Sequence, residues 1–536
     1  MLAMPRPAVV RYGGLAGSLA LAAAAWLGGA TDPWQPTITP GTIFAGDNGV
    51  LLPLAWLAGT GLLIAAWVAG VRSAPTARWA YVTAVLWMLP LLAFLPLGSY
   101  DAYSYACQGW QQSAGLDPYG GGVDVLGCPW ADAVAPTWRD APAPYGPLFL
   151  VLAGVAAQTG SLTVTLAGLR VIALLGIALI AVALPTLARR GGVPPGRAVW
   201  LVLACPLVPI HLVSGAHNDA LMVGLVAAGL ALAIRANPAG SAASAGFAAS
   251  ADSATSAGRG AGAVADSGET IRATGRRADL AGWAAGLLLG LAIAVKATAL
   301  VVVPFALLLM IERYPQFRGA SPGPVDSREV SSAQRRKFGP RPWWLGPVIR
   351  VVAGALVGLA AASLVSGRGF GWVTALSGSG KSVQWTSPPT AVGMAIGLFG
   401  PDAVPVTRVL GIVALAFVLV VLWWKARDNN PLRYAGYALA ATVLLAPVFH
   451  PWYALWPLAI LAATLHTHLN WLVVPCAVVS ALCLPDGYNL ALAVKTQGAV
   501  AMTVFLVWIV VHEAKIRSAG RRRADHVADR LSGPDA

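Results

Sequence analysis

Residues Val50–Val71 read VLLPLAWLAGTGLLIAAWVAGV, a run without a charged side chain. A helix of about 20 apolar residues is long enough to cross the hydrocarbon core of a bilayer. Similar runs recur along the chain, so we predict an all-α polytopic membrane protein with about 13–14 transmembrane helices. The predicted spans are Tyr12–Ala30, Val50–Val71, Trp79–Leu97, Leu162–Leu187, Ala198–Val213, Ala220–Ile234, Leu280–Val295, Ala299–Ile311, Leu345–Ser366, Val404–Trp424, Ala435–Val448, Tyr453–Leu465, Leu469–Leu484 and Gly498–Val511.

The composition agrees with a chain that lies mostly in lipid. Hydrophobic residues make up 57% of it and charged residues 11%, and the mean hydropathy is +0.68. Soluble domains carry about a quarter charged residues, so the composition excludes an ordinary soluble protein. The further apolar run Tyr145–Gln158 is predicted to be an interfacial or re-entrant helix, because another span would break the charge pattern described next.

Lys and Arg are distributed unevenly between the connections, and every second connection carries a basic cluster, except the short turn His466–Asn470. Basic residues collect in cytoplasmic loops, so we expect both termini in the cytoplasm of a multi-pass plasma-membrane protein. The net charge of +14 is then mainly a signal of orientation, and nucleic acid is excluded as a partner. The clusters are Arg6/Arg11, Arg72/Arg78, Arg189/Arg190/Arg197, Arg235 to Arg277, Arg313 to Arg341, Lys425/Arg427/Arg433 and Lys515 to Arg530.

The same pattern divides the chain into a transmembrane domain, residues 1–511, and a cytoplasmic basic tail, residues 512–536. Within the domain we expect a large outer catalytic loop at 98–144 and a second outer loop at 367–390. Residues 236–278 are rich in Ala, Ser and Gly and are predicted to form a disordered cytoplasmic linker. Residues 314–342 are predicted to be a second cytoplasmic loop.

Three ionisable residues stand at the ends of apolar spans, where solvation of a loop does not explain them: Asp101, Asp219 and Lys296. Burying a charge beside lipid is costly, so each is a candidate functional residue. Each also has a structural alternative. Asp101 would cap the helix that follows it, Asn218 or Asp219 would cap the span that begins at Ala220, and Lys296 would extend to the interface.

Several short motifs, taken in order, resemble one enzyme family. They are Asp101-Ala102-Tyr103-Ser104-Tyr105-Ala106-Cys107-Gln108-Gly109, Gly115-Leu116-Asp117-Pro118-Tyr119, Pro144-Tyr145-Gly146-Pro147-Leu148, Gly215-Ala216-His217-Asn218-Asp219-Ala220-Leu221, Val295-Lys296-Ala297-Thr298 and Phe449-His450-Pro451-Trp452-Tyr453. Together they resemble the polyprenol-phosphate-mannose-dependent α-(1→6)-mannopyranosyltransferases (MptA/MptB type) of the GT-C class. The resemblance covers about Leu15 to Val511 without the linker.

The resemblance implies a membrane mannosyltransferase that works on the outer face of the plasma membrane. Its donor would be polyprenol-phosphate-mannose and its acceptor a growing α-(1→6)-mannan of a lipoglycan. A single displacement would invert a β-mannosyl phosphate to an α product. Many GT-C enzymes place two acids close together, whereas here the second position is Tyr103, so we expect no metal and no cofactor.

The chemistry needs a base for the acceptor hydroxyl and cations or donors for the leaving phosphate. Asp101 is the candidate base. Lys296, Arg368 and Lys381 are candidate phosphate ligands, although Arg368 and Lys381 would alternatively be solvated loop residues. The further predicted substrate-binding residues are Tyr103, Tyr105, Gln108, Tyr145, His217, Asn218, Asp219, His450, Trp452 and Tyr453. Trp452 and Tyr453 would either stack on a sugar or belong to an aromatic belt.

Five cysteines are present. Cys107 and Cys128 fall in the loop assigned to the oxidising side, so a disulfide between them is a candidate. Cys205, Cys476 and Cys483 lie in apolar spans and are expected to be inert, and no Cys/His cluster has zinc-ligand spacing.

Two alternatives remain at this point. One is a multi-pass lipid or sugar transporter, which would show broken helices in matching halves and ionisable groups near the midplane. The other is a GT-C transferase of another sugar, such as arabinose or glucose. The ionisable groups cluster at the outer ends of spans, which favours a glycosyltransferase over a transporter.

Overall fold

The computed structural model describes residues 6–34, 50–237, 267–311, 344–376, 380, 382–486 and 490–531. Helices form all of the regular secondary structure in this part of the chain. Seven of the helices are long and apolar enough to cross a membrane, and a bent pair of helices would make an eighth span. The prediction of an all-α polytopic membrane protein is therefore confirmed. The seven are α1 (Pro7–Gly28), α2 (Leu51–Ser73), α8 (Leu162–Gly191), α10 (Asp219–Ala236), α15 (Leu345–Ser366), α18 (Val404–Ala426) and residues 495–512 of α23 (Lys495–Leu531).

The predicted span Leu280–Val295 falls in the long helix α12 (Ser267–Ile293), and each of the remaining predicted spans coincides with a shorter or interrupted helix. Proline lacks the backbone N–H that continues a helix, and it stands at several of these breaks. Pro90 marks the change from α3 to the 3₁₀ turn η1, and Pro206 separates α9 from η3, which are bent by 63°. The shorter helices are α3 (Ala77–Met88), η1 (Leu89–Leu92), α9 (Pro195–Leu203), η3 (Val208–Ser214), η4 (Ala297–Val302), α13 (Val303–Ile311), α19 (Pro431–Leu445), η7 (Pro451–Ala454), α20 (Leu455–Leu461) and α21 (Asn470–Ala481).

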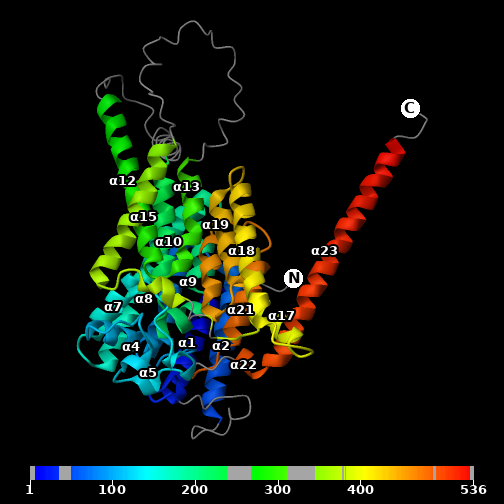
Figure 1. Ribbon diagram of the computed structural model, residues 1–536. Helices are drawn as coiled ribbons and strands as arrows, with labels where there is room; N and C mark the ends of the chain where they lie inside the picture. Colours follow the sequence, from blue (N-terminus) through cyan, green and yellow to red (C-terminus); the bar gives the residue numbers. More distant parts are fainter. Residues whose placement is uncertain are drawn as a thin grey trace.

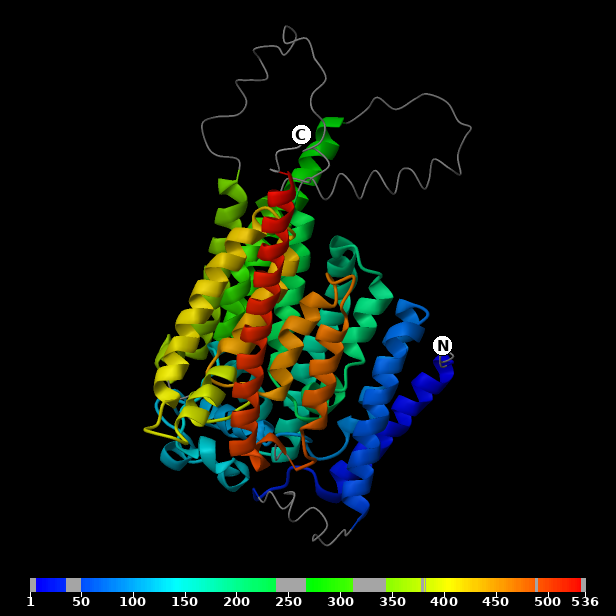
Figure 2. The same ribbon diagram turned by 90° about the vertical axis from the view of Figure 1, so that its right-hand side faces the viewer.

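Figure 1 shows the helices α10, α12 (Ser267–Ile293), α13, α15, α18 and α19 packed as a bundle. Short helices of the 98–157 region cover one end of it, at the bottom of the view, and the C-terminus lies at the other end. Figure 2 shows the same separation from the side. These short helices are α4 (Asp101–Ser113), α5 (Val123–Leu126), η2 (Ala131–Ala133), α6 (Pro136–Arg139) and α7 (Pro147–Ala157). At 11 residues, α7 is too short to span a bilayer.

Small residues bring α8 and α10 into backbone contact. A Cβ atom on Gly176 would lie 2.3 Å from the backbone of Ala220, and one on Gly224 would lie 2.4 Å from the carbonyl oxygen of Gly176. Gly therefore allows a separation between these helices that a larger side chain would prevent. The contact at Ala220 fixes the position of the preceding residue, Asp219, which belongs to the candidate site.

The predicted linker and loops are described only in part. Residues 238–266 and 312–343 lie outside the described residues, and with them most of the linker 236–278 and the whole loop 314–342. Residues 267–278, the last part of the predicted linker, belong to the helix α12. The loop 367–390 contains α16 (Gly371–Ala375) and the start of α17 (Pro388–Ile396). The tail 512–536 continues α23 as far as Leu531, and α22 (Leu490–Ala493) precedes that helix.

Candidate active site

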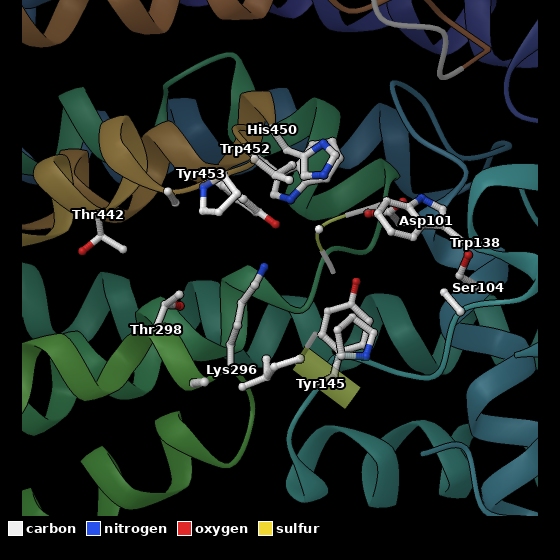
Figure 3. A pocket seen from close by; sticks show the side chains of 18 of the residues that line it. Asp101, Ser104, Trp138, Tyr145, Lys296, Thr298, Thr442, His450, Trp452 and Tyr453 are labelled. Atoms are coloured by element: carbon white, nitrogen blue, oxygen red, sulfur yellow. The ribbon is translucent and has the colours of Figure 1, made fainter. Parts of the chain in front are cut away.

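A cavity of about 260 Å³ lies between the short helices of the 98–157 region and the bundle (Figure 3). Its wall combines a few polar groups with a larger apolar surface, as is usual for a site that binds a small molecule or cofactor. The lining side chains that carry polar or aromatic groups are Asp101, Ser104, Gln108, Trp138, Tyr145, Lys296, Thr298, Thr442, His450, Trp452, Tyr453 and Trp456.

Lys296 enters the cavity from a break between two helices. α12 ends at Ile293, Lys296 adopts an extended conformation (φ −152°, ψ 123°), and η4 begins at Ala297. The ammonium lies 2.8 Å from a carboxylate oxygen of Asp219 and 4.4 Å from the ring centre of Tyr453. Cations are attracted to aromatic faces at this range. Lys296 therefore points inward, and the alternative in which it extends to the membrane interface is not what the structure shows.

Asp219 is fully buried behind Lys296, at the first position of α10. Its Oδ1 accepts hydrogen bonds from the Lys296 ammonium and, at 2.7 Å, from the indole N–H of Trp456. The preceding Asn218 occupies the N-cap position but forms no side-chain capping bond. The capping alternative is thus not realised, and the contacts of Asp219 are those of a residue that positions Lys296.

Asp101 is the first residue of α4 and lines the cavity. Its backbone N–H donates to Ser99 Oγ at 3.0 Å, and its carboxylate lies 3.7 Å from His217 Nδ1. Burial raises the pKa of Asp101 to about 6, although the charge of Lys296 acts in the opposite direction. The N-cap of α4 is Tyr100 and not Asp101, so the alternative in which Asp101 caps this helix is not realised. A carboxylate with a pKa near neutrality is suited to accept a proton.

His217 and His450 form an aromatic stack with Trp452. The ring of Trp452 lies 3.9 Å from that of His217 and 4.7 Å from that of His450, between centroids. Burial is the main cause that lowers the pKa of His217, and it also lowers the pKa of His450 to about 3. Both imidazoles are therefore neutral, and the contact between His217 and Asp101 is a polar contact rather than an ion pair. The hydroxyl of Tyr105 lies 3.1 Å from His217 Nδ1, so a hydrogen bond holds this ring in its orientation.

The structure sorts the predicted site residues into three groups. Those that line the cavity are Asp101, Gln108, Tyr145, Lys296, His450, Trp452 and Tyr453. Those buried directly behind it are Tyr105, His217, Asn218 and Asp219. Two lie elsewhere. The hydroxyl of Tyr103 donates to the carbonyl of Ala30 at 2.6 Å, and Arg368 donates to Gln112 at 3.0 Å.

Two of the predicted residues therefore lie away from the cavity, and a third cannot be placed. Tyr103 lies on the side of α4 that packs toward Ala30, and Arg368 joins its loop to α4, so neither lines the cavity. Lys381 lies outside the described residues. A disulfide joins Cys107 to Cys128 and ties α4 to the loop that follows it.

Some lining residues were not predicted from the sequence, namely Ser104, Trp138, Thr298, Thr442 and Trp456. Helical spacing could have identified two of them. Ser104 is three residues after Asp101, and Trp456 is four residues after Trp452, so each shares a face with a predicted site residue. Trp138 lies in the four-residue helix α6, which is too short for a helical pattern to identify it. Among the residues that the structure describes, no three His, Cys, Asp or Glu side chains gather as a possible metal site.

Comparison with known proteins identifies the family. The family model described as "Alpha-(1->6)-mannopyranosyltransferase, N-terminal domain" matches residues 11–312, and the model described as "MptB C-terminal domain" matches residues 389–512. The chain belongs to the alpha-(1->6)-mannopyranosyltransferase family. The resemblance inferred from the motifs is confirmed, and the chain is assigned to the glycosyltransferases rather than to the transporters.

Curated relatives cover most of the chain. It is 33% identical to Alpha-(1->6)-mannopyranosyltransferase A of Mycobacterium tuberculosis over 454 residues, which is 80% of this chain and 75% of the relative. A second alpha-(1->6)-mannopyranosyltransferase of that organism is 32% identical over 70% of this chain and 64% of its own length. Alpha-(1->6)-mannopyranosyltransferase A of Corynebacterium glutamicum is 28% identical over 76% and 78%. No solved structure matches the chain.

Proposed function

We propose that this protein transfers mannose from polyprenol-phosphate-mannose to a growing α-(1→6)-mannan of a lipoglycan on the outer face of the plasma membrane. The names of its relatives support the mannosyl transfer and the linkage. One observation carries the proposal: Asp101 and Lys296 line the same cavity, whose wall is otherwise largely apolar. A carboxylate and an ammonium in one such cavity supply a base and an anion ligand for a lipid-linked sugar phosphate.

The reaction is a single displacement at the anomeric carbon of the donor. The acceptor oxygen forms a bond to that carbon while its proton passes to the carboxylate of Asp101. The bond between the anomeric carbon and the phosphate oxygen breaks, and its electron pair remains with the phosphate. Attack opposite to the leaving group converts a β-mannosyl phosphate into an α-mannoside.

Lys296 is prepared to receive the phosphate. An ammonium group has three N–H donors, and one of them is directed at Asp219. The other two are available to a ligand in the cavity. His450 lines the same cavity as a neutral imidazole and adds a further polar group without adding charge. A phosphate is a good leaving group and needs no strong acid to protonate it. The ammonium of Lys296 then only has to stabilise the negative charge on the departing phosphate.

The cavity has an apolar end suited to the lipid of the donor. In Figure 3, Thr298 and Thr442 lie on the opposite side of Lys296 from Asp101. The cavity lining also includes Val443, next to Thr442 in the chain, and Ala446, both of which are apolar. A phosphate held at Lys296 would place the start of a polyprenyl chain against these side chains and the mannose toward Asp101.

The experiment uses purified protein in lipid nanodiscs with radiolabelled polyprenol-phosphate-mannose and a short α-mannoside acceptor. We expect an elongated product whose new linkage is α-(1→6) by linkage analysis. Parallel reactions with polyprenol-phosphate-arabinose and polyprenol-phosphate-glucose test the choice of sugar, and Asp101→Asn is the matched inactive control. Transfer of one of these sugars in preference to mannose, or no transfer at all, would overturn the proposal.

A further inference from the structure

Three side chains on one face of α4 line the cavity in a row: Asp101, Ser104 and Gln108. Their spacing of three and four residues places them above one another along the helix. The hydroxyl of Ser104 and the carbonyl oxygen of the Gln108 side chain are both buried without a hydrogen-bond partner in the described structure. Buried polar atoms are nearly always paired in proteins, and both residues line the cavity, so a ligand there is expected to supply the missing partners.

Trp138 lines the same end of the cavity. It is half-buried in the short helix α6, and Figure 3 shows its indole beside Asp101 and Ser104, away from Thr298 and Thr442. Aromatic rings offer a broad apolar face at a small cost in conformational entropy, which suits them to contact a flat partner. The C–H face of a pyranose is such a partner, and its hydroxyl groups would lie within the reach of polar neighbours.

The backbone around Trp138 is held firmly in place. The guanidinium of Arg139 donates to the carbonyls of Val134 at 2.9 Å and Asp132 at 3.0 Å. Gly122 packs against the carbonyl of Arg139 so closely that a Cβ atom there would lie 2.2 Å from it. The cavity therefore has a fixed aromatic wall at the end where Asp101 stands, rather than a side chain on a loose loop.

The direction of the reaction assigns this wall to one substrate. A displacement places the attacking oxygen and the leaving phosphate on opposite sides of the anomeric carbon. With the phosphate at Lys296, the acceptor must approach from the side of Asp101, which is the side of Trp138 and Ser104 in Figure 3. The donor lipid occupies the other end.

We propose that Trp138, Ser104 and Gln108 form the acceptor subsite, in which Trp138 stacks on the sugar that presents the attacking hydroxyl. This inference rests on the proposed function. The seven helical steps from Asp101 to Gln108 correspond to roughly 10 Å along the helix, comparable with the length of a disaccharide. The subsite therefore contacts two sugar residues of the acceptor, and a disaccharide is a better acceptor than a single mannoside.

The test measures acceptor and donor kinetics separately, with a methyl α-mannoside and an α-(1→6)-mannobioside as acceptors. Trp138→Ala is expected to raise KM for both acceptors by about tenfold, which corresponds to about 1.4 kcal/mol, and to leave KM for the donor within about twofold. Trp138→Phe keeps an aromatic face and should recover most of the affinity. Gln108→Leu should remove the advantage of the disaccharide over the monosaccharide. Trp471→Ala, at a Trp that is 78% exposed and not in the cavity, is the control for loss of an indole.

A direct binding measurement separates this inference from the proposed function. Saturation-transfer NMR with the mannobioside and purified protein, without donor, should show binding that Trp138→Ala weakens. If the wild-type protein binds the mannobioside through Trp138 but transfers no mannose, the proposed function fails and the subsite stands. If it transfers mannose while acceptor KM is unchanged in both Trp138→Ala and Gln108→Leu, the subsite fails alone. An effect confined to donor KM would also overturn it.

If Trp138→Ala does not fold, as judged by size-exclusion chromatography, Gln108→Leu and Trp138→Phe decide the outcome by the same criteria.

Discussion

The ammonium of Lys296 lies 2.8 Å from the carboxylate of Asp219, and the two residues come from separate breaks in the helical bundle. Asp219 begins α10 after the π-helical segment η3, and Lys296 stands between α12 and η4. A regular helix would have directed both side chains along helix surfaces. The breaks instead turn them toward each other at the wall of the cavity, and the indole of Trp456 completes the contact.

The first prediction concerns this pair. Asp219→Asn keeps the size of the side chain but removes the charge that holds Lys296. Loss of one partner from a buried ion pair leaves the other uncompensated and costs about 3–5 kcal/mol when the pair is fully buried. Since Lys296 is 12% exposed, we expect a smaller loss, of about 10²-fold in kcat/KM for the donor.

Steady-state kinetics with varied donor check this expectation. Trp456→Phe is the matched comparison, because it removes one hydrogen bond to Asp219 and keeps the charge pair. Its loss should be about tenfold or less, since a single hydrogen bond contributes about 1 kcal/mol. Equal effects of the two substitutions would show that the charge of Asp219 is not what positions Lys296.

The second prediction concerns pH. The pKa of Asp101 is raised to about 6, so the carboxylate is mostly protonated at pH 5 and mostly ionised at pH 7. A base acts only in its ionised form, so kcat/KM should fall about tenfold per pH unit below about pH 6 and should be flat above about pH 7. A pH–rate profile with saturating donor measures this. A profile that is flat from pH 5 to pH 7 would exclude Asp101 as the titrating base.

The third prediction concerns metal. Tyr103 occupies the position where many GT-C enzymes carry a second acid, and its hydroxyl is bonded to the carbonyl of Ala30. We expect turnover to persist in excess EDTA, because Lys296 supplies the positive charge for the phosphate. The measurement is the transfer rate before and after chelation. Complete loss that Mg²⁺ or Mn²⁺ restores would require Asp101 to be treated as a metal ligand.

The fourth prediction concerns orientation in the membrane. The loop after α4 and the polar end of α23 lie at opposite ends of the bundle in Figure 1, and basic residues collect near the latter. Ser113 and Ser518 are both exposed, so a cysteine at either can be labelled. Ser113→Cys should react with a membrane-impermeant maleimide in intact cells, and Ser518→Cys only after permeabilisation. The reverse pattern would place the cavity on the cytoplasmic side.

Sequence patterns predicted the helical fold well because lipid requires long apolar helices. They did not reveal where a helix bends, since the apolar run 198–213 has the composition of a span but is bent by 63° near Pro206. For the site, the ionisable residues at span ends identified Asp101 and Lys296. The partnership of Asp219 with Lys296 joins residues 77 positions apart and depends on helix packing that no local pattern encodes. Trp138 was not predicted because its four-residue helix α6 is too short to show a periodic pattern.

The most direct test of the central claim is the single-turnover rate of mannose transfer by Asp101→Asn, with donor bound and acceptor saturating. A carboxamide of the same shape cannot take the proton of the acceptor hydroxyl, so the account predicts a rate lower by about 10²–10⁴-fold, with donor affinity and protein stability nearly unchanged. A variant that keeps more than about a tenth of the wild-type rate, outside this range, would contradict the assignment of Asp101 as the catalytic base.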